Sequence, residues 1–154
     1  MTFGTATDDG LTTIEGSKAA VSKKGNLVSL GKRVTHPCVD ASITVSDEDT
    51  NVRTITIQLK DAYGNDISEV TAFQLAVFAN AAGTAYATTG GSTGVAIGTD
   101  GALLAVVAKK LFHCTSESDG DWDGTWTDTG TESVAIGVIL PNGNVVISEA
   151  FANA

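Results

Sequence analysis

The chain has 154 residues and a formal net charge of −9 at pH 7, enough for one domain with its own core but too short for two ordinary domains. Its early acidic residues, and the absence of any apolar run approaching about eighteen residues, predict neither a secretory signal nor a membrane-spanning helix. Two prolines and 17 glycines, with many Thr, Val, Ala and Ile residues, favour a β-protein with many tight turns.

The N-terminal segment, residues 1–40, differs from the rest in charge and composition. It is rich in Gly, Ser, Thr and Lys, and its short apolar pieces LTTI and NLVSLG predict isolated strands within an extended arm. Residues 1–33 hold five basic and three acidic residues, a balance of +2, whereas residues 34–154 hold four and fifteen, a balance of −11. The basic residues are Lys18, Lys23, Lys24, Lys32 and Arg33. They indicate a solvated tail or an arm that docks on an acidic partner, while the acidic remainder argues against nucleic-acid binding.

Regular alternation of apolar and polar residues begins at Ala41. The segments ASITVS (41–46) and VRTITIQLK (52–60) each place apolar residues on one face, and the second has Ile55, Ile57 and Leu59 there. This pattern is typical of half-buried strands. The DAYGND sequence that follows predicts a chain reversal, because Gly and Asn tolerate positive φ.

Further strand candidates follow at regular intervals. They are TAFQLAVFA (71–79), AYATTGGSTG (85–94, a strand entering a glycine-rich bend), VAIG (95–98), GALLAVVAKKLFHCTS (101–116), DWDGTWTDTG (121–130), SVAIGVILP (133–141) and NVVISEAF (144–151). The alanines of SEVTAFQLAVFANAA also fit a helix, but its β-favouring residues and the preceding turn favour a strand. PNGN (141–144) predicts a hairpin with Asn142 and Gly143 in a type I′ turn. Residues 41–154 are therefore predicted to form an immunoglobulin-like antiparallel β-sandwich of about seven to nine strands.

Aspartates at alternate positions in ESDGDWDGTWTDTGTE raise the question of a calcium site. Asp119, Asp121, Asp123 and Gly124 spell the D-x-D-x-D-G opening of a calcium loop, but the twelfth position, which needs a bidentate Glu, holds Gly130. On a strand, the same spacing puts the tryptophans on one face and the carboxylates on the other. A hairpin with one apolar and one wet face is the better interpretation, and weak calcium binding stays open.

Two histidines lie beside the two cysteines, in His36-Pro37-Cys38 and His113-Cys114. These are zinc-ligand residue types without zinc-ligand spacings, so we expect a core thiol at Cys114, a surface imidazole at His113 and no metal. The two cysteines are able to form one bridge but are expected to be reduced.

The sequence contains no motif that predicts catalysis or a cofactor. Neither histidine lies in the context of a known nucleophile, and GGSTGVAIGTDG lacks both the lysine of a phosphate-binding loop and the G-x-G-x-x-G order. The acidic pairs near residues 119–123 resemble solvated side chains more than a glycosidase pair. We expect a protein that binds or builds rather than an enzyme.

Two stretches carry a resemblance to known proteins. VRTITIQLKDAYGNDI is similar to the strand, D-A-x-G-N turn and strand that open bacterial and phage immunoglobulin-like domains. The run from GVAIG to SEAF resembles the C-terminal part of small structural proteins of tailed bacteriophages, in which a T-S-E-x-D-G-D hairpin and a final L-P-N-G hairpin recur. Together they cover about residues 41–151.

The resemblance implies a head decoration, or cement, protein on the capsid surface of the virion, made in the bacterial cytoplasm. Its expected partners are the major capsid protein and further copies of itself, as a dimer or trimer, without nucleic acid, membrane or cofactor. Its basic arm, with Lys18, Lys23, Lys24, Lys32 and Arg33, is expected to contact the capsid. Trp122 and Trp126 fit either an inter-sheet core or a contact patch.

Three other functions remain open from the sequence. A tail or fibre module would contact host glycans through the tryptophans and the acidic hairpin. A bacterial adhesion domain of the invasin type is disfavoured by the missing export signal and by the single domain. An enzyme would require a site that the sequence does not display.

Overall fold

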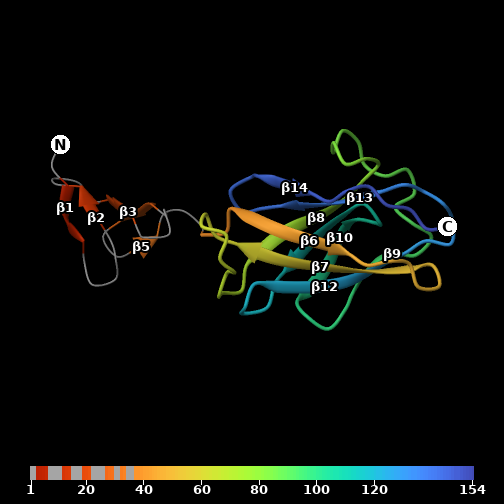
Figure 1. The fold of residues 1–154 in the computed structure, drawn as a ribbon, viewed down its shortest axis with the longest axis horizontal. Coiled ribbons are helices and arrows are strands. Elements are labelled where there is room, and N and C mark those ends of the chain that lie inside the picture. Colours follow the sequence, from red (N-terminus) through yellow and green to blue (C-terminus); the bar gives the residue numbers. More distant parts are fainter. Residues whose placement is uncertain (1–2, 7–11, 15–18, 22–26, 30–31, 34–36) are drawn as a thin grey trace.

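The structure is a computed structural model that describes residues 37–154 and, before them, the backbone of five short strands within residues 3–33. Every regular element among these residues is a β-strand (Figure 1). None of the described segments forms a helix long and apolar enough to cross a membrane. The all-β class predicted from the sequence is confirmed.

The described N-terminal strands pair with one another in chain order. They are β1 (Phe3–Ala6), β2 (Thr12–Ile14), β3 (Ala19–Val21), β4 (Leu27–Ser29) and β5 (Lys32–Arg33). Each is antiparallel to the next, in a sheet separate from the other two described sheets. The apolar pieces LTTI and NLVSLG supply β2 and β4, so the prediction of isolated strands was wrong: an apolar strand satisfies its backbone groups best beside a neighbour.

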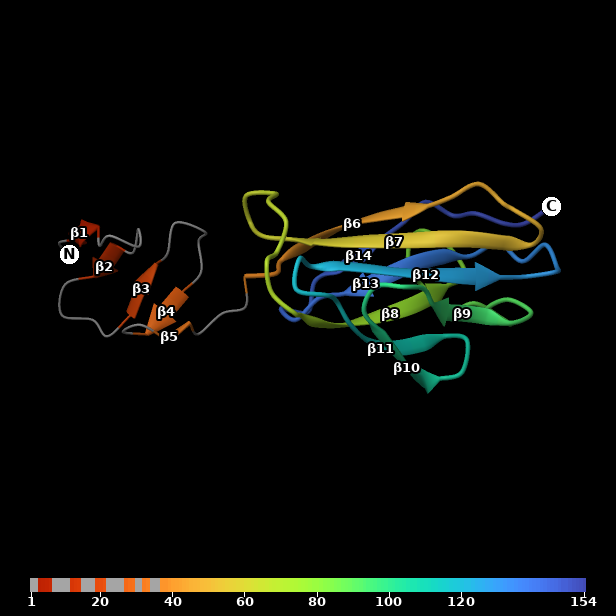
Figure 2. The same ribbon diagram turned by 90° about the horizontal axis from the view of Figure 1, so that it is seen from below.

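Two antiparallel sheets form the sandwich in residues 40–147 (Figures 1 and 2). Their strands are β6 (Asp40–Val45), β7 (Val52–Lys60), β8 (Ala72–Phe78), β9 (Gly94–Ile97), β10 (Ala102–Val107), β11 (Leu111–Thr115), β12 (Asp121–Thr127), β13 (Ala135–Ile139) and β14 (Val145–Ile147). The order β6-β7-β12-β9 in one sheet and β8-β13-β14 in the other matches the A-B-E-D and C-F-G strands of an immunoglobulin-like sandwich. The hairpin β10–β11 extends the second sheet beyond β8.

Two predicted strands differ from those observed. GALLAVVAKKLFHCTS forms two strands rather than one, because the chain turns at Val107, whose carbonyl accepts a hydrogen bond of 3.0 Å from Lys110 N, and Lys109 has a φ of 61°. A positive φ at a lysine has no sequence signature. AYATT contributes only an isolated bridge between Phe78 and Tyr86 where the chain crosses from one sheet to the other, so that strand prediction was wrong.

Three reversals share one geometry, at residues 61–65, 117–121 and 140–144. In each, the glycine at the fourth position donates its N–H to the first carbonyl, and the first N–H donates to the fifth carbonyl. The three glycines, Gly64, Gly120 and Gly143, have φ values of 80°, 79° and 87°. The prediction of a type I′ turn at PNGN was therefore wrong in type, although the hairpin is confirmed. Pro141 fixes a negative φ that suits a type I turn, and Gly143 then supplies the left-handed residue.

The core lies between the two sheets. Ile55, Ile57 and Leu59 of β7 are fully buried, as their alternation predicted. Phe73, Leu75 and Val77 meet them from β8.

Candidate functional site

The basic residues of the N-terminal segment are only partly placed by the structure. Lys18, Lys23 and Lys24 lie outside the described residues. Lys32 and Arg33 form β5, where they are the register partners of two residues of β4. Capsid contact by these five residues stays a prediction.

The two tryptophans of β12 belong to the inter-sheet core. Both Trp122 and Trp126 are 0 % exposed. Each ring meets an aromatic partner edge to face: Phe73 at 6.3 Å from Trp122 and Phe151 at 5.3 Å from Trp126, between ring centroids. Their indole N–H groups donate to the carbonyls of Ala102 and Gly90, both at 3.1 Å. Of the two interpretations, the core is correct, because no part of either ring is left for a contact patch.

The D-x-D-x-D-G aspartates serve the turns around β12. Asp119 lies in the 117–121 turn, where its Oδ1 accepts from Asp121 N at 3.3 Å. Asp123 reaches the β9–β10 connection, where its Oδ1 accepts from Asp100 N at 2.6 Å and from the Thr99 hydroxyl at 3.5 Å. Local backbone donors therefore explain this spacing.

Asp121 is the least satisfied carboxylate of this group. Burial raises its pKa, and the neighbouring charges of Asp100, Asp119 and Asp123 act in the same direction. Its buried Oδ1 finds no hydrogen-bond partner in the described part of the chain. Within that part, no group of three or more His, Cys, Asp or Glu residues is placed to hold a metal ion.

The cysteines are buried thiols rather than a disulfide. Burial raises the pKa of Cys114 to about 12 and that of Cys38 to about 11. His113 is exposed beside Cys114, as predicted, whereas His36 lies outside the described residues. At neutral pH both thiols stay protonated and unreactive.

The glycine-rich bend at residues 89–91 is bound by the chain's own carboxylate. Glu132 accepts hydrogen bonds from Thr89 N at 3.0 Å and Gly90 N at 2.9 Å, and also from the Thr89 hydroxyl. Burial acts to raise the pKa of Glu132, but these donors outweigh it, so the pKa is lowered. No local pattern in the sequence predicts this contact, because the partners are more than 40 residues apart. These backbone donors, which in other proteins bind phosphate, hold a loop here.

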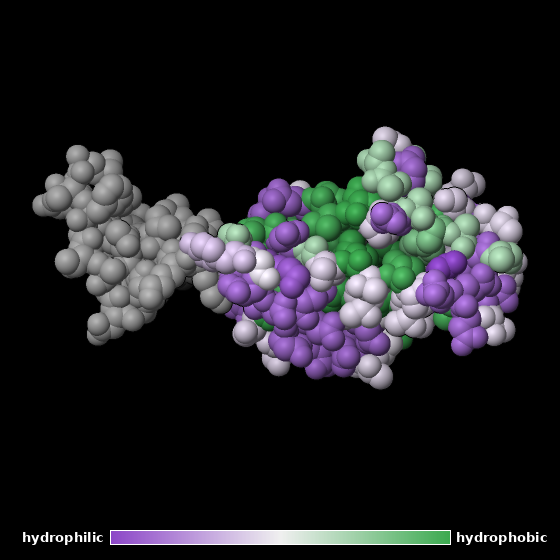
Figure 3. Space-filling model, in the orientation of Figure 1, coloured by the Kyte–Doolittle hydropathy of each residue, from purple (hydrophilic) through white to green (hydrophobic). Residues whose placement is uncertain are grey.

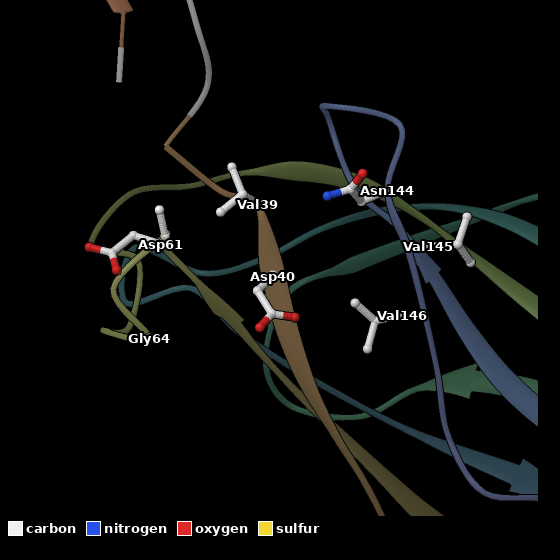
Figure 4. A pocket seen from close by; sticks show the side chains of 8 residues that line it. Val39, Asp40, Asp61, Gly64, Asn144, Val145 and Val146 are labelled. Atoms are coloured by element: carbon white, nitrogen blue, oxygen red, sulfur yellow. The ribbon is translucent and has the colours of Figure 1, made fainter. Parts of the chain in front are cut away.

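A pocket of about 540 Å³ opens where the chain enters the sandwich (Figure 4). Val39 and Asp40 line one side, and Asn144 to Val146 line the other. The Asp61 carboxylate at its rim is held by its own turn, accepting from Tyr63 N at 2.8 Å and Asn65 N at 3.0 Å. Asp40 accepts from Ala41 N at 2.8 Å. The pocket thus combines valine side chains with carboxylates that already have backbone donors.

A second hollow, of about 360 Å³, lies further along the same side of the sandwich. Residues from β6 and from the chain after β14 line it, including Ile43, Val45 and Phe151. In Figure 3 apolar residues gather over the region of β6 and β14, beside a hydrophilic area over β7 and β12. Arg53, at the wall of this hollow, fastens the C-terminal residues: it donates to Ala152 O at 2.6 Å and Asn153 Oδ1 at 2.9 Å.

Comparison with known proteins adds similarity of shape only. No protein-family profile and no curated protein sequence matches the chain. A crystal structure of a β-glucuronidase from Parabacteroides merdae aligns with 88 % of this chain and 16 % of its own length, at 11 % identity and a TM-score of 0.44. A cohesin module from a Clostridium perfringens family 33 glycoside hydrolase aligns with 77 % of this chain and 95 % of its own, at 13 % identity and a TM-score of 0.38. Likenesses this weak carry no inference about function.

Proposed function

We propose that this chain is a non-enzymatic structural protein of a tailed-phage particle that decorates the head and stabilises the capsid lattice. One observation carries the proposal. The three turn motifs behind the phage resemblance, D-A-x-G-N, T-S-E-x-D-G-D and L-P-N-G, coincide with the three reversals of shared geometry in the sandwich. The residues that carry the resemblance thus build a scaffold.

The use of the polar residues supports a scaffold as well. Asp61, Asp123 and Glu132 bind backbone amides of turns or loops. Their carboxylates are therefore engaged in holding the fold.

The mechanism we propose is lattice cementing through many weak contacts. A decoration protein holds neighbouring capsid subunits against the pressure of packed DNA, and repeated weak contacts achieve this through avidity. Residues 1–33 of the N-terminal segment, with a balance of +2, meet acidic capsid surface, and the sandwich, within residues 34–154 with a balance of −11, faces solvent.

Two measurements test this proposal. Quantitative mass spectrometry of purified particles should find this chain in hundreds of copies, on the order of the major capsid protein, as avidity across a lattice requires. A handful of copies would favour the tail or fibre alternative, and absence from particles would end the virion proposal. Deleting residues 1–33 should leave a folded sandwich, whose core residues lie between Cys38 and Phe151, that no longer binds capsids. Capsid binding equal to that of the full chain would contradict the role of the segment.

A further inference from the structure

Strand β10 has an unusual surface for the edge of a sheet. It lies at the end of the order β10-β11-β8-β13-β14, so one of its two sides is open among the strands that the structure describes. Its sequence is ALLAVV, yet Leu104, Val106 and Val107 are 68 %, 55 % and 50 % exposed. Leu103 packs against the core, which places Leu104 on the opposite, outer face of the sheet. The strand therefore offers open backbone groups and apolar side chains together.

The other described edges of the sandwich are protected differently. The six residues of β6 include Asp40, Ser42 and Thr44, all exposed. The strands β9 and β14 are short, with four and three residues. Charged side chains, polar side chains and short length are the usual means of keeping an edge from pairing. β10 has a register irregularity between Ala105 and Val107, which is a further means of protecting an edge, but the strand has no polar side chain.

The charges at the two ends of β10 identify the partner that fits this edge. Asp100 precedes the strand and donates its N–H to Asp123, and the charges of Asp100, Asp119 and Asp123 all act on Asp121. Lys109 and Lys110 lie in the turn that joins β10 to β11. The Lys109 ammonium already donates to Gly91 O and Ser92 O, so Lys110 supplies the basic charge of this end. The acidic end of one copy is thus complementary to the basic end of another, and only an antiparallel arrangement brings unlike ends together.

We propose that β10 pairs antiparallel with β10 of a second copy of this chain, joining two sandwiches through one continuous sheet. A two-fold axis near Ala105 sets the exposed Leu104, Val106 and Val107 of one copy against the same residues of the second copy. The same antiparallel arrangement brings the Asp100 end of one copy toward the β10–β11 turn of the other, and this turn holds Lys110. The apolar side chains supply the affinity of this dimer, and the backbone hydrogen bonds between the two β10 strands fix their alignment. A parallel pairing would place like charges beside each other at each end, so the end charges disfavour it.

Disulfide trapping tests the register. Directly opposed residues of an antiparallel pair have Cα atoms about 4.5–5.5 Å apart, within disulfide range. Ala105→Cys in the full chain should therefore give a covalent dimer on mild oxidation. The matched control is Thr44→Cys, an exposed position on β6, the other six-residue edge strand. The native thiols are buried, with pKa values of about 11 and 12, and should contribute no cross-link. Equal cross-linking at both positions would overturn the assignment.

Sedimentation equilibrium tests the interface without cross-linking. The full chain should be dimeric, and Leu104→Lys should make it monomeric by placing two like charges across the axis. Val145→Lys, at a residue 47 % exposed on β14, should stay dimeric. Lys110→Asp should weaken the dimer, and adding Asp100→Lys should restore it. A monomeric full chain, or a dimer that survives Leu104→Lys, would overturn the proposal. These outcomes need only the purified chain and are independent of any role in a virion.

Discussion

Strands β12 and β10 use apolar residues in opposite ways. In β12, DWDGTWT alternates strictly, lies between β7 and β9, and buries both tryptophans completely. In β10, ALLAVV carries only apolar residues, lies at an edge, and leaves most of them exposed. Alternation and position in the sheet, rather than the mean hydropathy of a segment, decide what a strand contributes to the core.

The largest effect should come from removing a ring of β12. Trp122→Ala or Trp126→Ala should lower the free energy of unfolding by about 3–5 kcal/mol, because each deletes a buried ring and orphans a carbonyl that accepted its indole N–H. Chemical denaturation checks this, with Trp→Phe at the same positions as the milder control. A loss below about 1 kcal/mol would contradict the placement of these rings in the core.

Filling the space between the two rings should lower the free energy of unfolding by less than removing a ring does. Gly124 lies between the tryptophans on the buried face, and a Cβ there would come within 2.5 Å of Trp122 Cη2 and 2.7 Å of Ala96 O. Gly124→Ala should therefore destabilise by about 1–3 kcal/mol through overpacking. Thr125→Ala, on the more exposed face of the same strand, is the control. It should lower the free energy of unfolding clearly less when the two variants are measured side by side. Equal costs would show that the buried face has room to spare.

The contact between Glu132 and the 89–91 loop, which covers Trp126, should contribute about 1 kcal/mol to the free energy of unfolding, and this contribution should depend on pH. Glu132→Gln keeps the shape of the side chain but loses the charge that binds Thr89 and Gly90. Because the folded pKa of Glu132 is lowered, its stabilisation is fully present above the unfolded carboxyl pKa and is lost as pH falls through the folded value. Unfolding curves of the variant and wild type should differ at neutral pH and converge in acid. A difference that persists unchanged in acid would rule out the charge as its cause.

The smallest effect on folding should come from β10 itself. Val106→Thr keeps a β-branched side chain at a position 55 % exposed, so the monomer's free energy of unfolding should change by less than about 0.5 kcal/mol. Unfolding should be measured at low protein concentration, where dimerisation adds nothing to stability. A loss comparable to that of Gly124→Ala would mean that β10 belongs to the core.

Local patterns in the sequence predicted much of the sandwich. The limits of VRTITIQLK match β7 residue for residue, and the alternation in DWDGTWT assigned the tryptophans and aspartates to the correct faces. The turn at PNGN was located correctly because its signal is local: Pro fixes a negative φ, and Asn and Gly tolerate a positive one.

Long-range contacts could not be predicted in the same way. The pairing of Asp123 with Asp100 N, and that of Glu132 with the 89–91 loop, join residues 23 and more than 40 positions apart. The turn that separates β10 from β11 depends on Lys109, whose φ is unusual for its residue type. For that reason the apolar run at 102–107 read as part of one long strand, and its exposed edge became visible only in the assembled sheet.

The chain enters the sandwich at one end of its long axis and leaves it at the other (Figures 1 and 2). A pull between these two ends runs lengthwise along β6, whose residues Asp40 to Val45 pair with Lys60 to Ile55 of β7. Loaded in that direction, the ladder is sheared, so its hydrogen bonds share the force and must break together instead of opening one by one. At the far end, the hydrogen bonds of Arg53 to Ala152 and Asn153 tie the last residues to β7. The sandwich should therefore resist a pull along its long axis better than a pull that peels β6 from β7 one hydrogen bond at a time.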